Sequence, residues 1–126
     1  MNEREYLSEL TDRVIGACYE VSNVLGSGFL EKVYEKALLK ELRLRGLKAE
    51  AQVPISIVYK GEQVGDYFAD ILVDDSLIIE LKCCDNLADE HMAQCLNYLK
   101  ATGHTIGLLV NFQKPKVQWR RVFRNY

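Results

Sequence analysis

Residues 77 to 82 read Leu77-Ile78-Ile79-Glu80-Leu81-Lys82, an apolar run that contains two opposite charges. A run of this length and composition is typical of a central β-strand that is buried on both faces. Glu80 and Lys82 are two residues apart, so on a strand their side chains point to the same face. Because a buried unpaired charge is costly, we expect these two side chains either to form ion pairs or to serve a function.

The preceding segment, residues 63 to 73, also has the composition of a strand and contains Asp70. Between the two segments lies Asp74-Asp75-Ser76, which is typical of a tight turn. Pairing about this turn predicts a hairpin in which Asp70 lies opposite the region of Glu80. The two carboxylates and the Lys82 ammonium would then share one small patch.

Such a patch allows two interpretations. The first is a buried ion-pair cluster without a chemical role. The second is a Mg²⁺ site, because Mg²⁺ is bound through one or two carboxylates together with waters and substrate phosphates. Asp70, Glu80 and the backbone carbonyl of Leu81 would supply oxygen ligands. Lys82 would orient an attacking water or stabilise charge on the attacked phosphate, and the reaction would be phosphodiester hydrolysis.

The other segments show helical or strand patterns. Apolar residues at helical spacing predict helices at residues 4–25, 29–45 and 88–101. Ser27 or Gly28 is expected to cap the second helix, and Asn86 the third. Alternating or continuous apolar runs predict strands at residues 52–59, 63–73, 77–83, 104–111 and 116–124. The order α-α-β-β-β-α-β-β predicts an α/β fold with a mixed sheet flanked by helices, and 126 residues predict a single domain over residues 1–126.

The formal net charge of -2 excludes a protein that is basic over its whole surface. Basic residues nevertheless gather in two places, either of which could contact phosphate. The C-terminal group has no acidic neighbours and comprises Lys114, Lys116, Arg120, Arg121 and Arg124. The second group is interspersed with Glu35 and Glu41, which also fits a solvated helix face, and comprises Lys32, Lys36, Lys40, Arg43 and Arg45.

The four cysteines match neither a zinc site nor a C-x-x-C pair. We expect reduced, mostly buried thiols, which is typical of a cytoplasmic protein. The N-terminus is charged from Glu3 onward, and no apolar run approaches the roughly 20 residues of a membrane span. The sequence therefore predicts no signal peptide and no membrane partner.

Three sets of residues together resemble a known group of enzymes. Asp70 and Glu80-Leu81-Lys82 resemble the motif of the PD-(D/E)XK nuclease superfamily, although Ala69 stands where the name of the motif has proline. Gln94 and Tyr98 resemble the Q-x-x-x-Y motif of its RecB-like and phage exonuclease branches. The segment from Gly28 to Tyr34 reads G-x-x-E-x-x-Y and is similar to the signature of the bacterial and archaeal GxxExxY proteins, a small PD-(D/E)XK-like family.

This resemblance implies a PD-(D/E)XK nuclease-like mixed sheet and a nuclease that depends on Mg²⁺ or Mn²⁺, with DNA as the favoured substrate. It implies that Asp70 and Glu80 bind the metal and that Glu31 completes the metal shell, directly or through water. It assigns Lys82, Gln94 and Tyr98 to the catalytic site. The structural alternatives are a Glu31 that only stabilises its helix N-terminus, and Gln94 and Tyr98 side chains that only pack.

Two other functions remain open at this stage. One is a catalytically silent nuclease fold that binds nucleic acid or a protein partner, or forms a homo-oligomer. The other is a phosphoester hydrolase that acts on small nucleotides. The intact set of Asp70, Glu80 and Lys82 favours the metal-dependent nuclease over the silent fold. His91 is assigned a structural or peripheral role, and Trp119 is expected to pack rather than to stack on a base.

Overall fold

The computed structural model describes residues 1–124. Within this range the chain forms three helices and five strands, which are α1 (Glu3–Leu25), α2 (Glu31–Leu44), β1 (Ala49–Tyr59), β2 (Glu62–Val73), β3 (Leu77–Lys82), α3 (Asp89–Thr102), β4 (Ile106–Asn111) and β5 (Gln118–Phe123). The predicted order α-α-β-β-β-α-β-β is confirmed.

The five strands form one mixed sheet in the order β1-β2-β3-β4-β5. Neighbouring strands are antiparallel except β3 and β4, which are parallel and are joined by the α3 crossover. As the sequence predicted, β3 lies at the centre of the sheet, and its residues from Leu77 to Leu81 are all buried.

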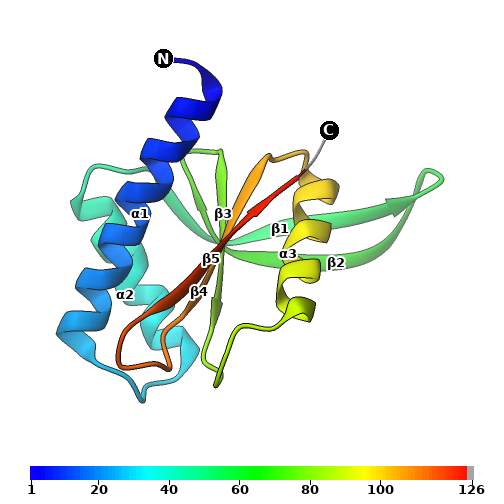
Figure 1. Cartoon of the computed structure of the whole chain (residues 1–126). Coiled ribbons are helices and arrows are strands. Elements are labelled where there is room, and N and C mark those ends of the chain that lie inside the picture. The colour runs from blue at the N-terminus through cyan, green and yellow to red at the C-terminus, as the bar shows by residue number, and fades with distance from the viewer. Residues whose placement is uncertain (125–126) are drawn as a thin grey trace.

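Helices cover both faces of the sheet (Figure 1). α1 and α2 pack on the face to which Ile79 and Leu81 contribute, and α3 packs on the face to which Ile78 contributes. Glu80 and Lys82 alternate with Ile79 and Leu81, so they lie on the α3 side of β3.

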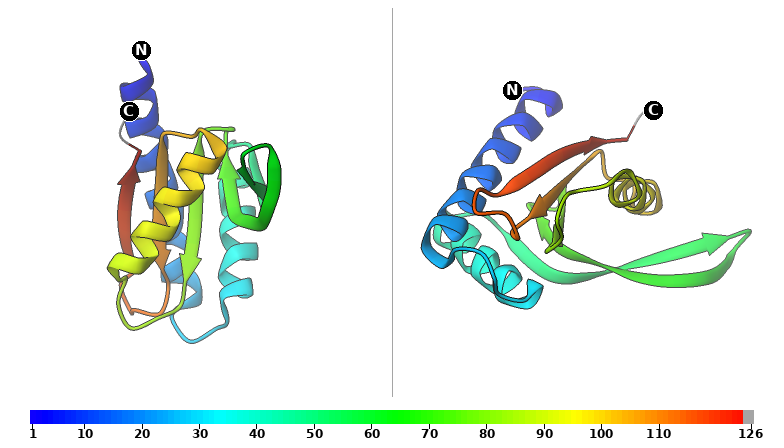
Figure 2. Two further views of the ribbon diagram at one scale, coloured as in Figure 1. Left: turned by 90° about the vertical axis from the view of Figure 1, so that its right-hand side faces the viewer. Right: turned by 60° about the horizontal axis from the view of Figure 1, so that its bottom comes forward.

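β1 and β2 continue well beyond the rest of the sheet as a two-stranded arm, which is seen in profile in Figure 2. β2 pairs with β3 only between Ile71–Val73 and Leu77–Ile79, whereas its pairing with β1 continues to the Tyr59↔Glu62 pair. The two strands therefore diverge immediately after the Ile71↔Ile79 pair. Asp70 and Glu80 are the first residues beyond this pair, as the predicted hairpin register required.

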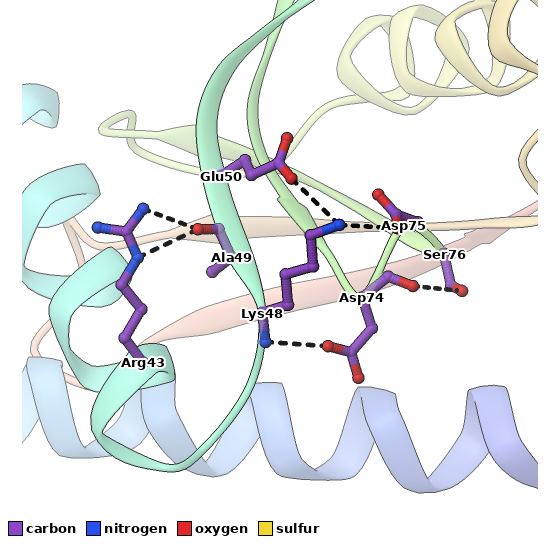
Figure 3. Close-up of polar contacts among 7 residues, drawn as sticks. All are labelled: Arg43, Lys48, Ala49, Glu50, Asp74, Asp75 and Ser76. Carbon is purple, nitrogen blue, oxygen red and sulfur yellow. Dashed lines mark hydrogen bonds and ion pairs between the residues drawn. The ribbon is translucent and has the colours of Figure 1, made fainter.

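The turn of the β2–β3 hairpin is fixed by the segment that enters β1 (Figure 3). The Lys48 backbone N–H donates a hydrogen bond to Asp74 Oδ1 at 3.0 Å, and the Lys48 ammonium lies 3.0 Å from Asp75 Oδ2. Asp74 and Asp75 both have positive φ angles, of 49° and 53°, a conformation that Asp tolerates in turns. These contacts hold the register that places Asp70 beside Glu80.

The predicted cap of α2 is wrong. The helix begins at Glu31 after Leu30, and no side chain caps it. Tyr34 organises the preceding loop instead, because its hydroxyl donates to the Gly26 carbonyl at 2.7 Å and accepts from the Phe29 N–H at 3.2 Å. Because the Tyr34 hydroxyl fixes this loop, the residues before Leu30 do not join the helix.

The predicted cap of α3 is also wrong. The helix starts at Asp89, and the Ala88 N–H donates to His91 Nδ1 at 3.0 Å. The His91 side chain therefore accepts a hydrogen bond from a backbone N–H at the start of the helix, and Asn86 does not cap the helix. This contact gives His91 the structural role that the sequence favoured over catalysis.

In the described part of the chain, all four cysteines are free thiols. Cys18 and Cys95 are buried, whereas Cys83 and Cys84 are only partly buried, so the expectation of mostly buried thiols holds for two of them. Among residues 1–124, none of the helices combines the length and apolar character that crossing a membrane requires.

Candidate active site

The point where β2 and β3 diverge is held together by a side chain. Asp70 Oδ2 accepts a hydrogen bond of 2.7 Å from the Leu81 backbone N–H. A carboxylate on β2 thus takes the place of a backbone acceptor for this residue of β3. The contact fixes the Asp70 carboxylate next to the segment Glu80-Leu81-Lys82.

Glu80 is a buried carboxyl group that lacks a full set of partners. Its residue is 5% exposed, and among residues 1–124 its Oε1 atom has no hydrogen-bond partner. Burial raises the pKa of Glu80 to about 8, and the neighbouring Asp70 charge contributes to this rise. A hydrogen bond from the Asp70 backbone and the Lys82 ammonium act in the opposite direction.

Two further carboxyl groups are affected by the same cluster. Burial raises the pKa of Asp70, and the charge of Glu35 adds to this, whereas the hydrogen bond from Leu81 and the Lys82 ammonium oppose it. Burial raises the pKa of Glu31 as well, with Asp70 as the second cause. Repulsion between neighbouring carboxylates is therefore a property of the whole cluster.

A cavity of about 70 Å³ opens between α2 and the diverging strands. Its wall is formed by Glu31, Lys32, Glu35, Gln52, Asp70 and Leu81. The structure thus brings Glu31 and Leu81 to the same small space as Asp70, whereas Glu80 does not line this cavity. Within the described residues, however, no three His, Cys, Asp or Glu side chains are grouped closely enough to hold an ion by themselves.

The donor set nevertheless fits a divalent cation. Mg²⁺ uses one or two carboxylates and completes its shell with waters and substrate oxygens, so a ready-made group of three acidic ligands is not required. One oxygen of Glu80 has no partner, and burial is the main cause of the raised pKa values of Asp70 and Glu80, so the ionised carboxylates have a deficit of favourable interactions here. A bound cation would remove this deficit.

Lys82 and α3 form the other side of the site. The Lys82 ammonium donates to Gln94 Oε1 at 3.4 Å, so the structure brings these two predicted residues together. Tyr98, one turn further along α3, is nearly buried, with its ring 5.5 Å from that of Tyr67. Burial raises the pKa of Tyr98 to about 12, with the charge of Glu80 as the second cause.

Comparison with known proteins identifies the family of the chain. The sequence profile described as the PD-(D/E)XK nuclease superfamily matches residues 8–122. This chain belongs to the PD-(D/E)XK nuclease superfamily. No curated protein matches it.

Solved structures show the same fold at low sequence identity. SSO0001 is 22% identical with a TM-score of 0.58, and the match covers 97% of this chain and 61% of that one. An alkaline exonuclease from Laribacter hongkongensis is 17% identical with a TM-score of 0.51, over 86% of this chain and 76% of that one. The complex of this exonuclease with dAMP gives 14% and 0.53 over the same shares. The chain therefore spans about three fifths of the length of SSO0001.

This member of the superfamily has a second layer of polar residues that sequence reasoning did not assign to the site. Glu35 is 5% exposed, and its Oε2 atom lies 2.6 Å from the Lys32 ammonium. The Gln52 amide donates both to Glu35 Oε1 and, at 3.5 Å, to Asp70 Oδ1. Gln52 thereby links α2 to the Asp70 carboxylate.

Only part of this layer left a signal in the sequence. Glu35 lies between Tyr34 and Leu38 on the helix face that turns out to be buried, and an acidic residue on such a face is unusual. Gln52 left no signal, because its role depends on a φ angle of 53°. This left-handed conformation of a strand residue is seen only in the structure.

The remaining candidates have structural roles. Tyr34, the last residue of the G-x-x-E-x-x-Y segment, is a core residue that stacks on Phe112 with ring centroids 4.8 Å apart. Trp119 donates from Nε1 to the Tyr19 hydroxyl at 3.3 Å and so packs as expected. In the C-terminal basic group, Arg121 forms an ion pair with Asp12 at 2.7 Å. Arg124 donates to the carbonyls of residues 103 and 104.

Proposed function

We propose that this protein is a Mg²⁺- or Mn²⁺-dependent nuclease that hydrolyses phosphodiester bonds in DNA, and that it belongs to the GxxExxY group of the superfamily. The observation that carries this proposal is the Glu80 carboxylate, buried beside Asp70 with one oxygen that has no hydrogen-bond partner. In a superfamily of nucleases, the simplest role of such a pair is to bind the catalytic metal ion.

The metal ligands would be Asp70, Glu80 and the backbone carbonyl of Leu81, with Glu31 acting through a water. Two carboxylates and a carbonyl suit a hard cation that prefers oxygen ligands. When bound, the ion would supply Lewis-acid stabilisation of the charge that develops on the phosphate. The Leu81 N–H supports this arrangement because it fixes the second oxygen of Asp70.

Lys82 is proposed to position the attacking water and to stabilise negative charge on the phosphate. Its ammonium is held by Gln94 from α3, so the charge is directed by a rigid helix rather than by a loop. Gln94 would act through Lys82. Tyr98 would limit water access beside Glu80, because its nearly buried ring covers this side.

The preference for a nucleic acid over a small nucleotide is supported by the open surroundings of the site. Gln94 and Tyr98 also line a hollow of about 800 Å³ between α3 and the β1–β2 arm. This hollow has room for part of a nucleic-acid strand next to the cleaved bond. The deoxyribonucleotide dAMP in the complex of one distant structural neighbour, an alkaline exonuclease, supports DNA rather than RNA as the polymer.

A second candidate function is a nuclease fold that binds nucleic acid without cleaving it. One observation favours it: in the described part of the chain, no group of three potential metal ligands is already assembled. Both candidates predict nucleic-acid binding, and only the first predicts hydrolysis.

The decisive experiment is a cleavage assay. We would incubate the protein with single- and double-stranded DNA and RNA, with and without Mn²⁺, beside Lys82→Ala. Loss of a charged group at the reacting phosphate is expected to reduce Mn²⁺-dependent DNA cleavage by at least about 100-fold. Lys60→Ala removes the same charge from the tip of the arm and should cleave like the wild type. If the wild-type protein cleaves none of these polymers with Mn²⁺, the proposed activity is wrong.

A further inference from the structure

α2 carries four exposed basic side chains along one line, namely Lys32, Lys36, Lys40 and Arg43. They are spaced by four, four and three residues, so consecutive members are neighbours on one side of the helix. Eleven residues of α-helix measure about 16 Å at 1.5 Å per residue. We call these four residues the basic stripe.

Acidic residues of the same helix cancel only the charge of Lys32, so most of the charge of the stripe is left. Glu35 is buried and pairs with Lys32 only, and Glu41 pairs with Arg45 at 2.8 Å, away from the stripe. Among residues 1–124, Lys36 and Lys40 form no ion pair. Arg43 donates to the neutral Ala49 carbonyl at 2.9 and 3.1 Å and so keeps its positive charge (Figure 3).

The stripe begins at the candidate active site. Lys32 forms part of the wall of the small cavity that contains Asp70 and Glu31. From there the stripe follows α2 to an open hollow of about 340 Å³ that Lys36, Lys40 and Arg43 line together with Leu39 and Leu44. A negatively charged polymer bound at the site can therefore extend along α2 and remain next to basic side chains.

The C-terminal basic group is exposed in part, but none of its residues lines the small cavity of the site. In this group Arg121 is paired with Asp12, so its charge is cancelled. Arg120 and Arg121 lie on β5, at the opposite edge of the sheet from β1, whereas α2 contacts β1. Of the two basic groups in the sequence, the one on α2 is both exposed and continuous with the site.

We propose that the basic stripe binds the sugar–phosphate backbone of the DNA that flanks the cleaved bond. The inference rests on the proposed function in taking DNA as the polymer. Along one strand of B-DNA the phosphates repeat about every 3.4 Å of helix axis, so about 16 Å of stripe can contact several of them. Contacts of lysine and arginine with phosphates carry no sequence information, so the stripe would strengthen binding to all sequences equally.

The test is DNA binding measured by fluorescence anisotropy with a labelled 20-base-pair duplex. Ca²⁺ replaces Mg²⁺, so that the carboxylates of the site are offset by a cation that also takes oxygen ligands. The affinity is measured at several KCl concentrations for the wild type and for Lys36→Ala/Lys40→Ala. The matched control is Lys116→Ala/Arg120→Ala, which removes two exposed charges from the C-terminal group.

The stripe variant should bind roughly tenfold more weakly at low salt, and the slope of log Kd against log salt should fall by about 2, one for each lost phosphate contact. The control should retain both the affinity and the slope of the wild type. The proposal is overturned if the two variants behave alike, if only the control weakens binding, or if the wild type binds no DNA. A protein that binds DNA through Lys36 and Lys40 without cleaving it would refute the proposed activity and support this inference.

Discussion

Glu80 has a carboxyl group whose ionisation opposes folding. Its pKa is 4.5 in the unfolded reference and about 8 in the folded protein, chiefly because burial disfavours the charged form. Between these values the folded state binds more protons than the unfolded state, so stability falls as pH rises. The pKa values of Asp70 and Glu31 are raised too, so their contributions have the same sign.

In the metal-free protein, the free energy of unfolding should therefore decrease as pH rises from about 5 to about 8. At 1.36 kcal/mol per pKa unit, the loss attributable to Glu80 is on the order of 4 kcal/mol. Glu80→Gln removes the ionisable group and should flatten most of this decline. Urea denaturation in EDTA across this pH range measures both profiles. A wild-type profile that is flat or rises with pH would show that the carboxyl group is not held in this environment.

Gln52 tests the second layer of the site. Its amide connects Glu35 with Asp70, so Gln52→Ala should release the Asp70 carboxylate and weaken Mn²⁺ binding about 10- to 100-fold, as loss of an outer-shell partner typically does. Gln63→Ala is the matched control, because the Gln63 amide contacts Asp66 on the arm. Calorimetric titration with Mn²⁺ compares the two. If Gln52→Ala and Gln63→Ala bind Mn²⁺ equally tightly, Gln52 has a role only in the structure of β1 and does not support the metal site.

At the residue scale, sequence reasoning identified the residues whose chemistry is unusual for their position. Glu80 and Lys82 were visible because charges interrupt an apolar strand, and Asp70 because a short turn fixes its register. Gln52 was not visible, because a glutamine in a strand is ordinary until its backbone conformation is known. Polar residues that act through other residues leave little trace in a single sequence.

At the scale of elements, α3 packs so closely on β4 that one position excludes any side chain. A Cβ atom on Gly107 would lie 2.5 Å from Cys95 Sγ, which is well inside contact distance. This approach seats α3, and with it Gln94, against the sheet.

Gly107→Ala should therefore destabilise the protein by about 1–3 kcal/mol, the usual cost of overpacking. In Cys95→Ala/Gly107→Ala the clashing sulfur is absent, so adding Gly107→Ala to Cys95→Ala should cost much less than adding it to the wild type. Thermal unfolding of the four proteins measures this coupling. If the effects of Gly107→Ala and Cys95→Ala on stability are additive, the destabilisation by Gly107→Ala comes from the backbone of residue 107 and not from the contact with Cys95.

The elements themselves were predictable because apolar periodicity determines which residues enter the core. The residues at which the helices begin were less predictable. Leu30 and Ala88 precede α2 and α3 without a capping side chain of their own, and the compensating contacts come from Tyr34 and His91 within the helices. Side chains that reach back to a loop are chosen by tertiary packing, which local propensity does not describe.

At the scale of the whole molecule, the divergence of β2 from β3 opens the sheet beside Asp70 and Glu80. α2 brings Glu31 and Glu35 from one side of this opening, and α3 brings Gln94 from the other. The fold class followed from the order of elements, but the arm did not. The alternation of apolar and polar residues in β1 and β2 shows which residues share a face of the sheet. It does not show over how many residues a neighbouring strand pairs with them.

Binding of a divalent cation by the Asp70–Glu80 pair can be measured by calorimetric titration of the metal-free protein with Mn²⁺. We expect saturable Mn²⁺ binding to the wild type that tightens as pH rises toward 8, because the raised pKa of Glu80 makes protons compete with the metal. Asp70→Asn and Glu80→Gln should each weaken binding at least about tenfold while remaining folded by circular dichroism. If the wild type binds no Mn²⁺ at pH 8, or if the variants bind it as tightly as the wild type, Asp70 and Glu80 are not the metal ligands.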